Sequence, residues 1–443
     1  MKIVIITIGT QGDARPFVAL GRRLKEKGHD IVIATSDNHK ELIETSGLTH
    51  APLRSDFAEL MAKEHAALDE GHPFTIGKKV SQVMTTWMPL WAQQGWEATE
   101  GADLIIGSGS GSGTVLGASL SEKRGIPFVQ TQFMPLTPSK EIPPLWPSPK
   151  KRMPGIVNFL LGHLVRLIVW RVLANPASII RKELGLEQFS WMGPWSSEYG
   201  DSGNRYILYA YSRYLLPQPS DWRSDRIAVT GNWFYDQADA WTAPADLVAF
   251  LESGNDKPIY VGFGSMRTGR SEEFTRKILD AIRKSGRRAV VATGWGALAK
   301  NQLVSADERI FFVDSVPHDW LFPRVSLAVH HGGAGTVAAA ARAGIPQILL
   351  PFVADQFFWR WRMHEIGINP VMLDRKTLTS EQLADAIHMA QGPRFLKAAK
   401  ILGEEIRSED GIQAAIDTLD KWGMFRETPV KKKEKKQAEP AGL

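Results

Sequence analysis

The sequence predicts an α/β protein with two Rossmann-like, doubly wound parallel-sheet domains that face each other across a cleft. The chain has 443 residues, more than a single hydrophobic core usually supports. A strand-helix-strand pattern fills the first 35 residues, and a second strand-helix series begins at Pro258. Apolar residues make up 43% of the chain and charged residues 23%, which is typical of a globular protein.

The first domain begins with an apolar strand at 3–8, a glycine-containing turn, and a helix at about 16–27 that stops at Gly28. A second strand at 30–35 completes a β-α-β unit, whose right-handed crossover implies a parallel sheet covered by helices. A buried strand at 102–106, the glycine loop 107–113 and a return strand near 125–129 repeat the theme. We therefore expect the first domain to span 1–215.

The second domain contains a helix at about 272–284 and a series of short apolar strands. These strands are expected at 259–263, 289–292, 310–313, 327–329 and 347–350. A proline-containing stretch at 215–226 predicts the linker, and 227–230 is expected to be an early strand of the second half. The expected divisions are a linker and domain start at 216–250, a second domain at 251–405, a C-terminal helix at 406–426 and a disordered basic tail at 427–443.

Composition narrows the classes of function. The net charge of +5 comes largely from the segment 431–436, which holds five lysines and one glutamate, so the remainder is almost neutral and nucleic-acid binding is not expected. The chain has no cysteine, which excludes disulfides and thiolate chemistry and is compatible with a cytoplasmic location. The N-terminal apolar run is too short for a signal peptide. We expect a cytoplasmic monomer or dimer.

A strand that ends in histidines and glycines, followed at once by a small-residue helix, predicts a diphosphate site. The segment 327–336 reads LAVHHGGAGT, and the helix 337–343 follows. Glycines allow a ligand to approach the backbone closely, and a helix N-terminus presents free N–H groups and the positive end of its dipole. We interpret His330 as a packing residue of the strand end, and His331 as the residue that contacts the ligand.

A second polar pair, Asp355-Gln356, follows the strand that ends near Leu350. Ligands bind beyond the carboxyl ends of strands in open α/β sheets. A carboxylate beside an amide can hydrogen-bond neighbouring hydroxyls of a sugar ring. The two motifs in succession predict a nucleotide-sugar site in the second domain.

These motifs resemble the donor signature of UDP-glycosyltransferases. The similarity is carried by His330–Thr336, the AGIP segment 343–346, Pro351 and Asp355-Gln356. It is strongest toward the sterol glucosyltransferase-like branch and the antibiotic glycosyltransferases, which have the GT-B fold. Supporting matches are Gly264-Ser265, 293–296, 316–322 and 230–233. The resemblance implies transfer of a hexose from a nucleotide diphosphate donor to a hydroxyl of a lipophilic molecule such as a sterol, polyketide or flavonoid.

The resemblance also implies a set of donor contacts. Its members belong to the diphosphate turn, the loops after the strands and the sugar-binding pair: Gly12, Ser265, Trp295, Val316, His318, His331, Gly333, Gly335, Thr336, Asp355 and Gln356. For His318 and Trp295 a purely structural role is an open alternative. Ser315 and Ala339 stand where plant-type members carry tryptophan and glutamate, so UDP is only weakly favoured over dTDP as the nucleotide.

Asp13 is the candidate general base. It lies in the loop 8–16 between the first strand and its helix, a position that carries aspartate in the sterol and antibiotic branches. A base near the acceptor hydroxyl is what direct, inverting displacement requires. The alternative is an N-terminal capping role, which is common for aspartate at a helix start. The chain has no D-x-D motif and no cluster with metal-ligand spacing, so neither a metal nor a resident cofactor is expected.

The acceptor side is expected in the first domain. Seven of the fifteen tryptophans lie between 87 and 195, which indicates either an apolar pocket or aromatic core packing. Trp87, Phe133 and Met134 are the candidate wall residues. The apolar stretch 156–173 contains His163 and two arginines, so it is not expected to span a membrane, although it could rest weakly on a membrane surface.

Two other classes of function stay open. A nucleotide-cofactor oxidoreductase is suggested by the glycine loop 107–113, but Ser112 or Thr114 stands where the third glycine of the dinucleotide-binding motif belongs. A catalytically silent nucleotide-sugar or lipid binder would retain the same donor motif.

Overall fold

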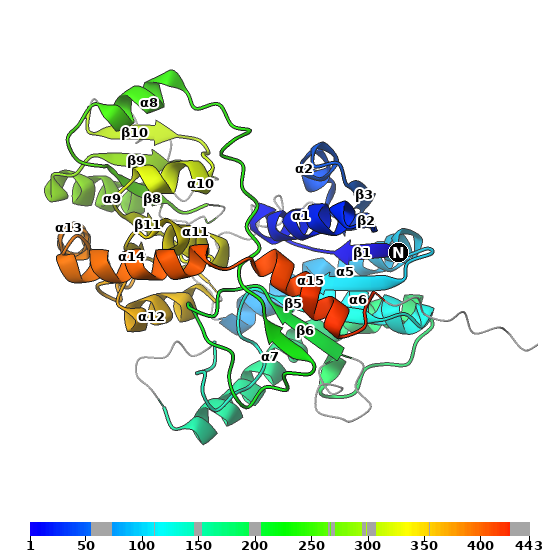
Figure 1. The fold of residues 1–443 in the computed structure, drawn as a ribbon. Helices are drawn as coiled ribbons and strands as arrows, with labels where there is room; N and C mark the ends of the chain where they lie inside the picture. The colour runs from blue at the N-terminus through cyan, green and yellow to red at the C-terminus, as the bar shows by residue number, and fades with distance from the viewer. Residues whose placement is uncertain are drawn as a thin grey trace, which may run out of the picture.

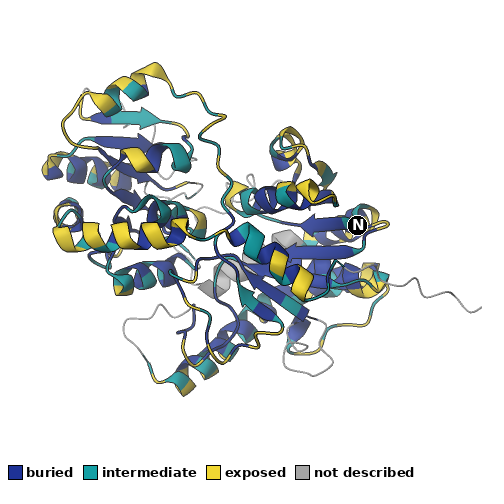
Figure 2. Cartoon of the chain, viewed as in Figure 1, coloured by how far each residue is buried: buried dark blue, intermediate teal, exposed yellow. Residues whose placement is uncertain are grey.

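The computed structural model describes residues 1–54, 73–109, 111–145, 153–194, 205–264, 266, 271–294, 298, 307–353 and 355–425. Within these residues the chain forms two α/β domains, each built around one parallel sheet (Figure 1). The predicted fold class is confirmed. Figure 2 shows the strands buried between helices, while the outer face of the helix at 393–407 is exposed.

The first sheet has seven strands in the order β3-β2-β1-β4-β5-β6-β7. Its strands are β1 Lys2–Ile6, β2 Asp30–Thr35, β3 Thr49–Pro52, β4 Leu104–Ser108, β5 Phe128–Gln132, β6 Arg205–Tyr209 and β7 Ile227–Val229. Its helices are α1 Gln11–Glu26, η1 Asp37–His39, α2 Lys40–Thr45, α5 Pro73–Ala98, α6 Ser112–Arg124 and α7 Gly155–Glu183. The central strand β1 is inaccessible to solvent over residues 3–6, because helices cover both faces of the sheet.

The second sheet has five strands in the order β10-β9-β8-β11-β12. Its strands are β8 Ile259–Gly262, β9 Ala289–Ala292, β10 Ile310–Val313, β11 Ala328–His330 and β12 Gln347–Leu349. The helices that follow in the chain are α8 Ala245–Glu252, α9 Ser271–Ser285, α10 His318–Leu321, η4 Phe322–Arg324, α11 Ala334–Ala343, α12 Gln356–Ile366, α13 Ser380–Ala390, α14 Pro393–Arg407 and α15 Gly411–Lys421.

The segment 227–230 was wrongly expected in the second domain. It contributes β7, which pairs in parallel with β6 of the first sheet, with Ile207 opposite Ile227 and Tyr209 opposite Val229. The connection between the domains therefore follows β7 rather than lying at 215–226. An apolar extended segment reveals that a strand forms, whereas its hydrogen-bonding partner is set by the fold.

The C-terminal helix returns to the first domain. Figure 1 shows α14 against the second domain and α15 against the first. Ile416 and Leu419 of α15 belong to the same buried cluster as Ile3 and Phe17. The close approach at the start of α15 needs glycine, because a Cβ on Gly231 would lie 2.9 Å from the Cα of Gly411. The chain therefore crosses between the domains twice.

Helix α12 forms a direct contact between the two domains. The Nε of Arg362 donates a hydrogen bond to the carbonyl of Leu215 over 2.6 Å. The rings of Tyr211 and Trp359 pack edge to face with their centroids 5.9 Å apart. These contacts set the first residues of α12 opposite the first domain.

Replacing Leu419 with alanine should destabilise the first domain, although the residue lies near the end of the chain. Leu419 is fully buried against β1 and α1, and truncating such a side chain costs about 2–5 kcal/mol. A lower denaturant midpoint is expected, with Lys421→Ala on the exposed face of α15 as the control. Equal midpoints for the two variants would show that α15 does not stabilise the domain.

Candidate functional site

Three loops of the second domain converge at the carboxyl ends of β8, β9 and β11. Gly264 has φ +57°, and a Cβ there would lie 3.3 Å from the Cε1 of His331. Gly294 has φ +56°, and a Cβ there would lie 2.5 Å from the carbonyl oxygen of Gly264. Glycine is required at both positions, since the loops leave no room for a side chain. The predicted phosphate turn therefore shares one site with the loops after β8 and β9.

His331 lies at the centre of this site. Its Nδ1 is buried and has no hydrogen-bond partner within the described part of the chain. Burial lowers the pKa of His331 to about 4, so the imidazole is neutral at pH 7 and one nitrogen carries a hydrogen to donate. Gly333 is the N-cap of α11, and a Cβ there would lie 2.6 Å from the Nε2 of His331.

The first turn of α11 is accessible at the same place. Gly335 is exposed and Thr336 is half-buried, so backbone N–H groups of this turn face an open space. The free N–H groups and the dipole of the helix make this N-terminus suitable for an anion.

His330 has a packing role, as its position in the strand indicates. Its Nε2 pairs with the Oε1 of Gln347 at 2.9 Å, and its Nδ1 accepts a hydrogen bond from the backbone N–H of Gly332 at 3.1 Å. The Nε2 of Gln347 donates to the carbonyl of Val337 at 3.1 Å. This buried network ties β11, β12 and α11 together and fixes the turn that carries His331.

Val316 and His318 lie at the end of β10 and the start of α10. Val316 is buried, and the His318 ring stacks on Phe322 with centroids 4.4 Å apart. Burial, together with the positive charges of Arg15 and His331, lowers the pKa of His318 to about 3. His318 is therefore held in place by packing within the second domain. It also lies close enough to Arg15 of the first domain for that charge to influence its pKa.

Asp355 caps α12 and faces the first domain. Its Oδ2 accepts a hydrogen bond from the Nε1 of Trp359 at 3.1 Å. Burial, with a smaller contribution from the charge of Asp13, raises the pKa of Asp355 to about 6. Asp13 and Asp355 come from different domains, and the contribution of the Asp13 charge shows that the two carboxyl groups lie within electrostatic reach of each other.

Gln356 adopts a different arrangement from the one its motif suggests. Its side chain is buried, and its Oε1 accepts hydrogen bonds from the backbone N–H groups of Phe352 and Val353 at 2.8 and 3.1 Å. Its Nε2 contacts the sulfur of Met266 at 3.4 Å. Gln356 thus shapes the loop that presents Asp355, and its amide oxygen is already occupied.

Asp13 takes part in the cap at the start of α1. It is the third residue of α1, and its Oδ2 accepts hydrogen bonds from the backbone N–H and the hydroxyl of Thr10 at 2.7 and 3.1 Å. Among the described residues none donates to Oδ1. Burial raises the pKa of Asp13, which makes its carboxylate a stronger base than a solvated one. Gly12 beside it is exposed, so solvent can reach the loop from the gap.

The candidate acceptor residues divide between two faces of the first sheet. Phe133 packs edge to face with Phe17, with centroids 5.6 Å apart, in the cluster beneath α1 and α15. Trp87 and Met134 are half-buried against the opposite cluster, where Trp87 contacts Trp91. The structure therefore groups Trp87 with Met134 and separates Phe133 from them. Ser265 and Trp295 lie outside the described residues.

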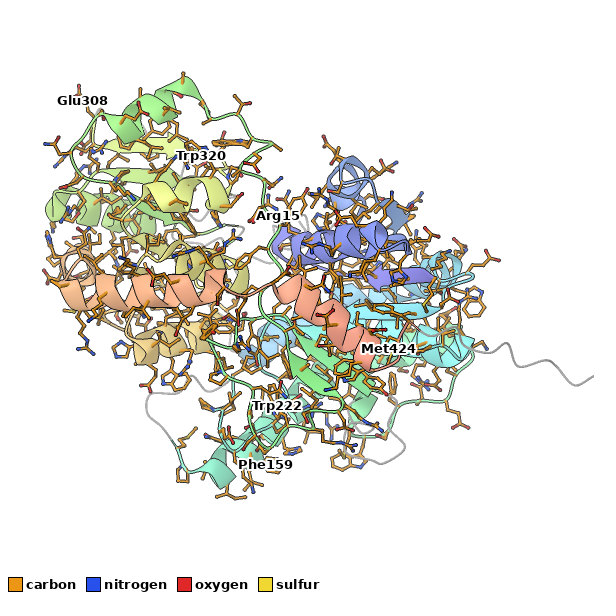
Figure 3. All side chains as sticks on the ribbon, viewed as in Figure 1. Arg15, Phe159, Trp222, Glu308, Trp320 and Met424 are labelled. Atoms are coloured by element: carbon orange, nitrogen blue, oxygen red, sulfur yellow. The ribbon has the colours of Figure 1, made fainter. Side chains whose placement is uncertain are left out.

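Arg15 is a site residue that the sequence interpretation missed. It lies on α1 where this helix meets the second domain (Figure 3), and its charge acts on His318 of that domain. Its terminal nitrogen donates to Gln11 at 3.2 Å, while its Nε is buried and has no partner within the described part of the chain. The sequence did contain a signal for this residue, because Arg15 is a basic residue only two positions after the candidate base Asp13.

Models of two known domain families match the chain, one in each half. The glycosyltransferase family 28 N-terminal domain matches residues 3–143, and the erythromycin biosynthesis protein CIII-like C-terminal domain matches 276–421. The chain matches these two domain families and has the GT-B fold. Solved GT-B structures superpose along the whole chain: the glycosyltransferase of kitacinnamycin (TM-score 0.66, 16% identity, 95% of this chain and 98% of that one) and the calicheamicin glycosyltransferase CalG4 (0.65, 17%, 95% and 98%).

Relatives in sequence are named sterol 3-beta-glucosyltransferases. A protein of Arabidopsis thaliana is 33% identical over 431 residues, which is 95% of this chain and 65% of the relative. A protein of Leptosphaeria maculans is 33% identical over 430 residues, again 95% of this chain but only 28% of the relative. The chain thus spans only part of the length of these relatives.

No group of three or more histidine or acidic side chains with metal-binding geometry occurs within the described ranges. Independence from metal stays a prediction. Groups at this site that suit an anion include His331, the start of α11 and, from the other domain, Arg15.

Stability should fall as the pH drops below about 6.5. His318 and His330 have folded-state pKa values of about 3 and His331 of about 4, so each binds a proton only after unfolding. The stability that each neutral histidine contributes is lost between its unfolded pKa of about 6.5 and its folded pKa, at up to about 1.4 kcal/mol per pH unit. Asp355 has the opposite effect, because its folded-state pKa is raised from 3.8 to about 6 and its protonation therefore favours the folded state as the pH falls. Asp355 is one group against three histidines.

This dependence can be measured by chemical denaturation between pH 4 and 7. The variant His318→Phe, which retains an aromatic ring against Phe322, should reduce the slope of stability against pH by about one proton. His388→Gln, at an exposed position of α13, should leave it unchanged. A His318→Phe slope equal to that of the wild type would contradict the buried neutral state.

Proposed function

We propose that this GT-B chain is an inverting, metal-independent glycosyltransferase that moves a hexose to a hydroxyl of a lipophilic small molecule. Glucose from UDP-glucose is the first candidate donor, and a sterol is the first candidate acceptor, because the longer relatives are named sterol 3-beta-glucosyltransferases. The supporting observation is the pair of carboxyl groups, Asp13 and Asp355, which come from opposite domains and lie within electrostatic reach of each other.

Asp13 is placed in the role of general base. Its Oδ2 is held by Thr10, which fixes the carboxylate, and Oδ1 is left to accept the proton of the acceptor hydroxyl. As that proton moves to Asp13, the acceptor oxygen bonds to the anomeric carbon and the bond from this carbon to the diphosphate oxygen breaks. The displacement inverts the carbon in a single step, and the nucleotide diphosphate leaves with the electron pair.

The negative charge of the leaving diphosphate is assigned to fixed dipoles. Neutral His331 donates a hydrogen bond, and the start of α11 supplies backbone N–H groups. Arg15 adds a full positive charge from the first domain. Asp355 is assigned to sugar hydroxyls, where its raised pKa would allow it to accept or donate hydrogen bonds near pH 6.

Replacing Asp13 with asparagine should lower kcat by about 10²- to 10⁴-fold, the usual contribution of a general base. Asparagine retains an oxygen for the Thr10 hydrogen bonds, so the start of α1 and the dissociation constant for UDP should be preserved. Asp37→Asn, at an exposed position of the same domain, is the control. The assay follows mass transfer to sterol, polyketide and flavonoid acceptors from UDP- and dTDP-hexoses.

Unchanged turnover of Asp13→Asn would remove this residue from the mechanism. A wild-type protein that binds the nucleotide sugar but transfers it to none of the acceptors would instead favour a catalytically silent binding protein with the same donor site.

Arg15→Gln should raise the KM for the nucleotide sugar about tenfold or more and leave the KM for the acceptor unchanged, since charge-assisted hydrogen bonds to phosphate are worth about 1.5–3 kcal/mol. Removal of this cation should also raise the pKa of His318, which nuclear magnetic resonance can follow. Arg22→Gln, exposed on the same helix, is the matched control. Equal donor affinities of the two variants would exclude Arg15 from the donor site.

A further inference from the structure

Helix α7 carries apolar side chains that the fold leaves uncovered. Ile156, Leu160 and Leu164 are 57%, 61% and 49% exposed, and Val157 beside them is 36% exposed. Their spacing places them on one side of the first three turns, because residues three or four apart lie one above the other. We define these four residues as the α7 stripe.

The opposite side of α7 is packed in the domain. Asn158, Gly162 and Val165 are buried, and a Cβ on Gly162 would lie 3.1 Å from the Cβ of Pro138. The helix is long and apolar enough to cross a membrane, but its buried side makes close contact with α5. A surface helix with one side fixed in the fold can enter a bilayer only with its free side.

The segment that contains α7 carries charges of only one sign over most of its length. Between residues 142 and 182 the sequence contains seven lysines and arginines and no acidic residue. Of the described cations in this segment, Arg171 and Lys182 are exposed and continue the line of the stripe along the helix. Arg181, in contrast, is buried and paired with Glu122 at 2.8 Å. The exposed side of α7 beyond the stripe therefore carries positive charge that is suited to anionic headgroups.

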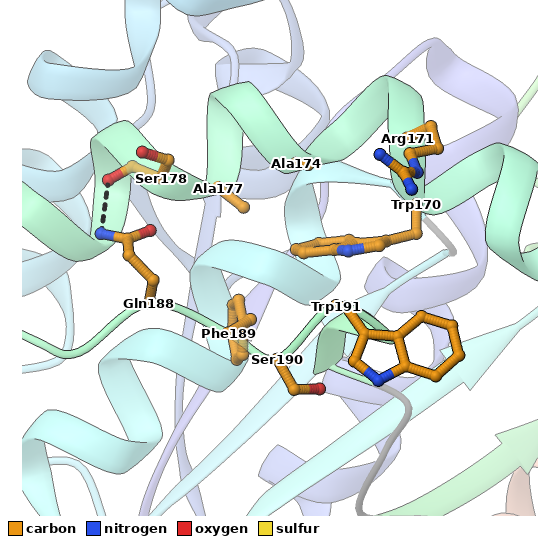
Figure 4. A pocket seen from close by; sticks show the side chains of 9 residues that line it. All are labelled: Trp170, Arg171, Ala174, Ala177, Ser178, Gln188, Phe189, Ser190 and Trp191. Atoms are coloured by element: carbon orange, nitrogen blue, oxygen red, sulfur yellow. Dashed lines mark hydrogen bonds between the residues drawn. The ribbon is translucent and has the colours of Figure 1, made fainter.

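An aromatic cavity of about 250 Å³ opens beside the exposed arginine. Arg171, Trp170, Phe189 and Trp191 line it (Figure 4). Trp191 is 71% exposed, although burial of an indole in a protein interior would be favourable. Tryptophan at a surface next to apolar and basic residues is typical of the interface between a bilayer and water.

The first turn of α7, whose outer side begins the stripe, packs with its inner side on the loop that follows β5. The Nδ2 of Asn158 donates to the carbonyl of Lys140 at 3.2 Å, and a Cβ on Gly155 would lie 3.0 Å from the same oxygen. This loop begins at Phe133, directly beyond the carboxyl end of β5, and contains Met134. A bilayer in contact with the stripe would therefore lie next to the segment that leads into the first domain.

We propose that the α7 stripe inserts shallowly into an anionic lipid bilayer, with Arg171, Lys182 and Trp191 at the headgroup level. The protein then works at a membrane surface, with the candidate acceptor side turned toward the lipid. The contact buries apolar area and neutralises headgroup charge, so it depends on anionic lipid and weakens with salt. It does not depend on which sugar or acceptor the enzyme uses.

Vesicle sedimentation of the full chain tests the proposal. The wild type should bind vesicles that contain one third phosphatidylglycerol more tightly than vesicles of pure phosphatidylcholine. The double variant Leu160→Glu and Leu164→Glu should bind them at least about tenfold more weakly. The matched control is Leu396→Glu with Ile401→Glu, which replaces a leucine and an isoleucine of similar exposure on α14. This control should bind vesicles like the wild type.

Two further measurements separate the sources of binding. Arg171→Gln with Lys182→Gln should reduce the preference for anionic vesicles and its salt dependence. Each comparison is repeated with the five lysines of 431–436 changed to glutamine, so that the basic tail cannot replace the stripe. Turnover of a water-soluble acceptor should be equal for the wild type and the stripe variant, which shows that the variant is folded.

Vesicle binding by the stripe variant at the wild-type level, or no binding by the wild type, would overturn the proposal. So would a wild-type dimer in sedimentation equilibrium that dissociates on the Leu160→Glu and Leu164→Glu changes, because a second copy of the chain would then cover the stripe. Failure of sugar transfer with intact vesicle binding would count against the proposed function alone.

Discussion

The site depends on the fixed position of α12 between the two domains. Parallel strands deliver their loops to one edge of a sheet, so each domain by itself presents only half of the polar groups. The hydrogen bond from Arg362 to Leu215 and the contact of Trp359 with Tyr211 hold the start of α12 against the first domain. Trp359 also binds Asp355 directly, so the same residue that joins the domains positions a site carboxylate.

Burial explains the chemistry of the gap. Ionisable groups from both domains have reduced access to water there. Burial disfavours the charged form of each group, so it raises the pKa of a carboxyl group and lowers the pKa of a histidine. Asp355 and Asp13 have raised pKa values, whereas those of His318 and His331 are lowered. Such an environment strengthens electrostatic interactions with a charged substrate and supplies a base stronger than a solvated carboxylate.

The capping role and the proposed catalytic role of Asp13 are compatible because a carboxylate has two oxygens. One oxygen accepts both hydrogen bonds from Thr10, and these bonds orient the group while the other oxygen stays open to the gap. Gly9 makes this possible, since a Cβ there would lie 2.2 Å from the bound oxygen. The helix cap thus acts as the support of the proposed base.

The sequence by itself determined the local elements and the turn that follows β11, because strand periodicity, glycine spacing and a histidine at a strand end are properties of neighbouring residues. The α/β class, β11, α11 and the role of His330 in packing could all be predicted in this way. The resemblance to a known family further predicted that Asp13 of the first domain acts together with a donor site in the second domain.

Only the tertiary structure decided how separate segments meet. It assigned β7 to the first sheet, placed Phe133 on the other side of that sheet from Trp87, and brought Arg15 within reach of His318. It also showed that the Gln356 oxygen is occupied by its own loop. These outcomes depend on strand pairing and on contacts between residues far apart in the chain, which no local pattern of side chains records.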